Sequence, residues 1–63
     1  MAILVKTFEN DTDFLICVFN CVSVYAVTIY DTICGAHQHA KICGSKEEAL
    51  QFAQNLNNQY VEP

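Results

Sequence analysis

Residues 14–30, FLICVFNCVSVYAVTIY, decide the fold, because no charged side chain lies between Asp13 and Asp31. A run of this length is near the minimum for a membrane-spanning helix, roughly 17 apolar residues. However, Asn20 and Ser23 interrupt its middle, and acidic flanks on both sides leave no Lys/Arg asymmetry to orient a span. The run is also rich in β-branched side chains, which are stiff at χ1 and suit a pleated sheet. We therefore interpret it as buried sheet and expect no membrane span.

The break inside this run sets the number of strands. Residues 20–23 contain neither Gly nor Pro, so the signal for a turn is weak. We predict two strands, residues 14–20 and 24–31, with one long bent strand as the alternative. Side chains alternate between the two faces of a strand, and both faces of each predicted strand are largely apolar. Such a pair of strands needs cover on both sides of the sheet.

Two further strands are predicted, one on each side of the run. Residues 2–9 alternate with a period of two, and the Asn- and Asp-rich residues 9–13 form the turn that follows. The faces of this first strand would carry Ile3, Val5 and Thr7 on one side and Leu4, Lys6 and Phe8 on the other. A turn at residues 31–35 uses Gly35, which can take a positive φ. Residues 36–43 then return as a more polar strand, which we place at an edge of the sheet.

The clearest local pattern is a helix over residues 46–58. Ser45 is a good N-cap, and Glu48 completes a Ser-x-x-Glu capping box. The apolar positions repeat at helical spacing and form one stripe, made of Ala49, Phe52, Ala53, Leu56 and Tyr60. A helix with a single apolar stripe can cover one face of a sheet and leaves the other face uncovered.

These elements predict one α+β domain over residues 1–63. We expect a small antiparallel sheet of three to four strands, in the order β-β-β-β-α, with one C-terminal helix packed on one face. The chain is 52% hydrophobic, and a domain this small buries only about 60% of the surface that its unfolded chain exposes. Since the second sheet face has no helix, we expect a homodimer, formed face to face or through edge strands.

Charge and the N-terminal sequence restrict the function. The net charge is −4, with three Lys and no Arg, so no basic stripe is present for nucleic acid, and we predict no direct binding of it. An acidic surface instead suits a protein partner that has a basic surface. The N-terminus has no basic region ahead of its apolar residues, which indicates a cytoplasmic protein without a secretory signal. The four cysteines are then expected to be thiols.

One set of residues has the chemistry of metal ligands, Cys34, His37, His39 and Cys43. The last three share strand parity and could face one way, and thiolate and imidazole are the usual zinc ligands. Their spacing matches no known zinc signature, so we predict no metal and no cofactor, and a small zinc-binding or thiol-redox domain is the alternative. The simpler interpretation is buried thiols and two histidines on an edge strand; a Cys34–Cys43 disulfide is a further alternative.

Catalysis has little support in the sequence. A Cys nucleophile would need a base beside it, and only Cys34 or Cys43 with His37 offers that pair. A core of this size leaves little volume for a ligand pocket. We predict that the protein is not an enzyme.

The turn after the first strand carries Glu9, Asp11 and Asp13, and Asp31 can lie near it. Its simplest interpretation is a solvated turn, because Asn and Asp favour turns for local reasons. As a functional site it would be an anionic patch for a basic protein partner. Tyr25 and Tyr30 on the uncovered sheet are the second candidate contact with a partner.

Together these features predict a small acidic protein-interaction module that acts as an inhibitor or adaptor. A phage- or mobile-element-encoded inhibitor of a host defence protein that binds nucleic acid, similar in role to anti-CRISPR proteins, would suit the size and the sign of the charge.

Overall fold

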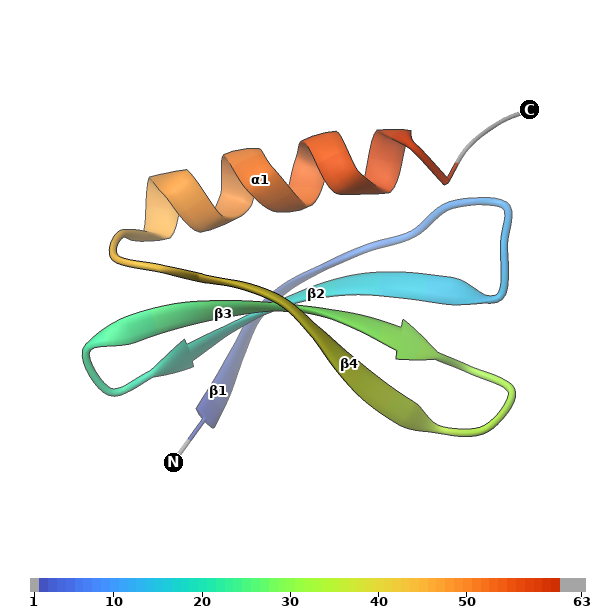
Figure 1. Cartoon of the computed structure of the whole chain (residues 1–63), viewed down its shortest axis with the longest axis horizontal. Helices are drawn as coiled ribbons and strands as arrows, with labels where there is room; N and C mark the ends of the chain where they lie inside the picture. The colour runs from blue at the N-terminus through green and yellow to red at the C-terminus, as the bar shows by residue number, and fades with distance from the viewer. Residues whose placement is uncertain (1, 61–63) are drawn as a thin grey trace.

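A computed structural model describes residues 2–60 and shows a four-stranded antiparallel sheet with one helix packed on it (Figure 1). Its elements are β1 (Ala2–Phe8), β2 (Phe14–Cys21), β3 (Val24–Asp31), β4 (Ala36–Cys43) and α1 (Lys46–Asn58). The predicted α+β class and the order β-β-β-β-α are confirmed. The decisive run is therefore two strands rather than one, and β2 continues one residue beyond the predicted end.

The sheet is a simple meander, with strands side by side in the order β1-β2-β3-β4. β2 and β3 pair without interruption from Phe14 opposite Asp31 to Cys21 opposite Val24. Only two residues join them, and Val22 takes a φ of 60°, which the tight turn requires but which a β-branched residue rarely adopts. The turn carries no Gly, so it left little trace in the sequence.

Each edge strand contains a β-bulge. In β1, Val5 is the extra residue between the pairs Leu4–Phe19 and Lys6–Val18. In β4, Ala40 is the extra residue between the pairs that His39 and Lys41 form with β3. A bulge reverses the face on which the following side chains lie. The predicted alternation in the first strand is therefore wrong beyond Val5: Thr7 shares a face with Leu4, and Lys6 shares one with Ile3.

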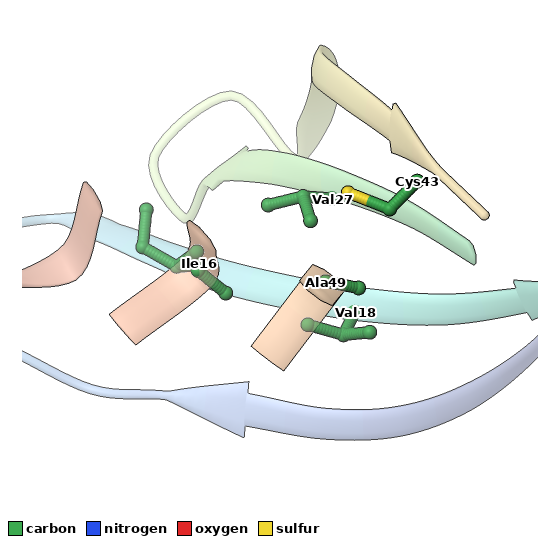
Figure 2. Packing of buried hydrophobic residues seen from close by; sticks show 6 residues of the cluster. Ile16, Val18, Val27, Cys43 and Ala49 are labelled. Carbon is green, nitrogen blue, oxygen red and sulfur yellow. The ribbon is translucent and has the colours of Figure 1, made fainter. Parts of the chain in front are cut away.

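The core lies between the sheet and α1. Ile16, Val18 and Val27 are completely buried and meet Ala49 and Ala53 of the helix (Figure 2). Cys43 at the end of β4 completes this cluster. Around it lie partly buried apolar side chains from β1, β3 and α1 and from a residue shortly after the helix, namely Val5, Phe8, Tyr25, Ile29, Leu50, Phe52, Leu56 and Tyr60. Alanines at the helix contact let its backbone approach the β-branched side chains closely.

Specific hydrogen bonds hold both ends of α1 in place. Ser45 is the N-cap as predicted, and its hydroxyl accepts from the backbone N–H of Glu48 at 3.2 Å. Near the other end, Asn57 is 7% exposed, and its side-chain amide donates to the carbonyl oxygen of Glu9 at 3.0 Å. The helix end is thereby tied to the turn between β1 and β2. Within the described chain no helix is long and apolar enough to cross a membrane.

Candidate interaction surfaces

The acidic turn and Asp31 do come together, at the end of the sheet where β2 begins and β3 ends. Phe14 pairs with Asp31, and the next residue, Thr32, donates its backbone N–H and its hydroxyl to the carbonyl oxygen of Asp13, at 3.0 and 2.8 Å. The loops after β1 and β3 therefore lie at the same end of the molecule (Figure 1). We call the four carboxylates gathered there, Glu9, Asp11, Asp13 and Asp31, the acidic end.

The turn is held by polar residues that are not acidic. The Asn10 side-chain oxygen accepts from both the backbone N–H and the hydroxyl of Thr12, and its amide donates to the side-chain oxygen of Asn57 at 2.7 Å. Thr12 in turn accepts from the backbone N–H of Phe14. Asp11 and Asp13 are exposed. Since Asn10 and Thr12 supply the hydrogen bonds, these two carboxylates can meet a partner without weakening the turn.

Two further features add negative character to this end. The Ile33 backbone N–H donates to an Asp31 carboxylate oxygen at 2.9 Å, and this bond, with a further one from the Cys34 thiol, lowers the pKa of Asp31 below its ordinary value of 3.8. The C-terminal end of α1 also lies here and has no basic residue in its last turn; such an end carries partial negative charge. Lys46 starts the helix at its opposite end.

The two tyrosines predicted as contacts lie on opposite faces of the sheet. Tyr25 is opposite Asn20 and Cys43 and packs against the core beneath the helix. Tyr30 is on the face without a helix, next to Asp31. Only Tyr30 can therefore contribute to a surface beside the acidic end.

The four metal-ligand candidates do not converge. His37 and His39 are opposite Tyr30 and Thr28 on the face without a helix, whereas Cys43 is 2% exposed in the core on the other face. The bulge at Ala40 separates them, so the predicted shared parity is wrong. Cys34 is exposed in a turn, and all four cysteines are free thiols. Burial, reinforced by the negative charge of Glu48, raises the pKa of the Cys43 thiol.

No group of three or more potential ligands that could hold a metal ion occurs in residues 2–60. An open groove of about 440 Å³ runs beside β1 and α1, lined by Lys6, Phe8, Glu47, Leu50, Gln51 and Gln54. Its lining contains neither Cys nor His, so neither member of the predicted Cys–His pair faces the groove.

The second surface is the sheet face that α1 leaves uncovered, which we call the open face. The register assigns fourteen residues to it, Ala2, Leu4, Thr7, Leu15, Cys17, Phe19, Cys21, Val24, Ala26, Thr28, Tyr30, His37, His39 and Ile42.

An aromatic cluster lies on this face, and sequence reasoning did not find it. The His37 ring sits 4.5 Å from the ring of Tyr30 and 5.5 Å from that of Phe19, measured between centroids. Thr28 Oγ1 lies 3.0 Å from His37 Nδ1, and Thr28 is only 5% exposed. Apolar residues on both faces of residues 14–30 signalled this surface, but nothing indicated the register that brings His37 between the two rings.

Comparisons of the chain with protein-family models, with curated proteins and with solved structures found no match.

Proposed function

We propose that this protein is a protein-interaction module that binds the basic surface of another protein through its acidic end. The observation that supports the proposal is that the loop with Glu9, Asp11 and Asp13 lies beside Asp31 at the end of β3. This loop is hydrogen-bonded both to Thr32, which follows Asp31, and to Asn57 of the helix. As an inhibitor or adaptor it would act by occupying the partner's cationic surface. A partner that binds nucleic acid would lose that surface to carboxylates in place of phosphates, and this is the action we propose for a phage- or mobile-element-encoded inhibitor.

Two physical effects favour such a contact. Glu9, Asp11 and Asp13 repel one another in the free protein, and a basic partner would relieve this repulsion and be steered in from solution. The turn is also fixed by Asn10 and Asn57 before any partner arrives. Because the loop is already ordered, binding does not have to supply the entropy of ordering it.

The test compares two double variants that change the net charge equally. Asp11→Asn with Asp13→Asn removes two charges from the acidic end, and Glu47→Gln with Glu48→Gln removes two at the start of α1, where Gln still suits the capping box. Affinity capture from the cell of origin with wild type and both variants identifies a candidate partner, and calorimetry then measures its Kd. We expect the first variant to weaken binding by about 1–2 kcal/mol, and the second to change it little.

Salt and fold provide the remaining readouts. Binding of wild type should weaken with rising salt, and this dependence should be smaller for the Asp11→Asn, Asp13→Asn variant. Circular dichroism should show both variants folded. If every captured protein binds the two variants equally well, the acidic end is only a solvated turn and the proposal fails.

A further inference from the structure

The two β-bulges have the same effect on where charged side chains lie: each moves a lysine to the other face of the sheet. Lys6 is the only charged residue of β1, and Lys41 is the only Lys, Asp or Glu of β4. Each bulge, at Val5 and at Ala40, immediately precedes its lysine. With uninterrupted alternation, Lys6 would share the face of Leu4 and Lys41 the face of His39, which is the open face.

The bulges turn both lysines to the helix side instead. Lys6 is opposite Val18, and its ammonium nitrogen lies 5.3 Å from the centroid of the Phe8 ring. Lys41 is opposite Val27, and its ammonium nitrogen lies 5.5 Å from the centroid of the Phe52 ring. As a result, none of the fourteen residues of the open face is Lys, Arg, Asp or Glu.

An apolar row crosses the open face from edge to edge. Leu4 is opposite Phe19, Phe19 is opposite Ala26, and Ala26 is opposite Ile42. We call these four residues the apolar row. Its two ends, Leu4 and Ile42, are each 53% exposed. An antiparallel sheet that faces water normally carries polar side chains on that side, so a face cleared of charge on both edge strands has the character of a covered face.

We propose that the open face is the interface of a homodimer, in which two copies pack sheet against sheet across the apolar row. The face has an adequate area. Strands of seven or eight residues at 3.3 Å a residue, four strands wide at 4.8 Å, give a footprint of about 500 Å² per copy and about 1,000 Å² for the pair. That reaches the minimum expected of a biological interface, about 1,000 Å² in total, and is slightly below the range of about 1,200–2,000 Å² for standard stable complexes.

The distribution of charge favours a second copy over a basic partner on the open face. A basic protein attracted by the net charge of −4 would meet the carboxylates at the acidic end, because the open face offers it no charge. Two open faces can meet without placing like charges opposite each other, and a two-fold axis makes one apolar row complementary to itself. The same bulges interrupt both edges of the sheet, which disfavours the edge-to-edge alternative.

This inference does not depend on the proposed contact at the acidic end, which involves other residues. Asp31 is on the helix side of the sheet by register, opposite Phe14 and Ala36. The dimer would therefore leave both acidic ends free and present two of them to a partner.

Sedimentation equilibrium with one matched control tests the dimer. Wild type should have twice the 7.1 kDa mass of the chain, and Leu4→Lys, which returns a charge to the open face, should have the single mass. Ile3→Lys is the control, because Ile3 adjoins Leu4, is 61% exposed and lies on the helix side. It should remain dimeric. Ile42→Lys at the other edge should dissociate the dimer as Leu4→Lys does.

A second measurement keeps the test decisive if a lysine variant does not fold. The melting temperature of wild type should fall over about a hundredfold dilution, because dissociation couples to unfolding. A wild type that sediments as a monomer and melts at the same temperature at every concentration overturns the proposal. A dimer that Leu4→Lys and Ile42→Lys leave intact, or that Ile3→Lys dissociates, also overturns it, since the interface would then lie elsewhere.

Discussion

The two faces of the sheet bury their side chains by different means. On the helix side, Ile16 and Val18 are completely buried because α1 lies over them. On the open face, Cys17, Ala26 and Thr28 are 5%, 3% and 5% exposed, although no helix covers them. Their larger neighbours, such as Phe19 and His37, provide the shielding. Small residues between large ones can thus be shielded from solvent within one sheet face, while the large side chains remain available for contact with another surface.

The largest expected loss of stability comes from a substitution in the core on the helix side. Ile16→Ala should lower the free energy of unfolding by about 2–4 kcal/mol, because it leaves a cavity that the packed helix cannot fill. Leu15→Ala is the matched change on the open face, where Leu15 is only partly buried, and we expect less than half that loss. Urea unfolding followed by circular dichroism measures both. Equal losses would mean that the two faces are covered alike.

A smaller effect is expected where α1 meets the first turn. Asn57→Ala removes the bonds to Glu9 and Asn10 and leaves polar groups of the turn without partners, so it should destabilise the fold by about 1–3 kcal/mol. Asn58→Ala next to it is the control, since Asn58 is exposed. Hydrogen exchange in the turn at residues 9–13 should also accelerate in the first variant and not in the second. Matching stability for the two variants contradicts this role of Asn57.

The smallest effect concerns stability in acid and Asp31, which lies on the helix side at the acidic end. Because the pKa of Asp31 is lowered in the folded state, its ionised carboxylate stabilises the fold at pH values above the pKa of the unfolded state, about 4. This stabilisation is lost as the pH falls through the lower pKa of the folded state. Asp31→Asn keeps a side-chain oxygen that can accept from the Ile33 N–H, but it cannot titrate. Between about pH 5 and about pH 2 the melting temperature of this variant should therefore fall less than that of wild type. Asp11→Asn is the control and should follow wild type. Identical pH profiles for wild type and Asp31→Asn would sink the prediction.

Much of the fold was predictable because its signals are local. The β-branched, uncharged residues 14–30 predicted the two central strands, and Ser45 with Glu48 predicted the start of the helix. The turn at residues 9–13 was found from its composition, although Asn10 and Thr12 make its hydrogen bonds rather than the aspartates. The meeting of Asp31 with Asp13 was anticipated in outline, because adjacent antiparallel strands bring alternate loops to the same end.

The rest was not predictable, because it depends on register. Neither Val5 nor Ala40 is a residue that signals a bulge, yet each reverses the face of every residue beyond it in its strand. Strict alternation therefore placed Cys43 with His37 and His39 as a possible metal site, although the core contains Cys43. The same error hid the charge-free character of the open face, since alternation puts Lys41 on it.

The short link between β4 and α1 has a consequence for how each face of the sheet is covered. α1 follows the four strands in the chain and packs on one of the two largely apolar faces of their sheet. α1 is joined to β4 by only Gly44 and Ser45, and a tether this short gives it a local concentration that a separate molecule cannot reach. Competition for the helix side is therefore decided within one chain. The concentration of a second molecule can therefore matter only for cover of the open face.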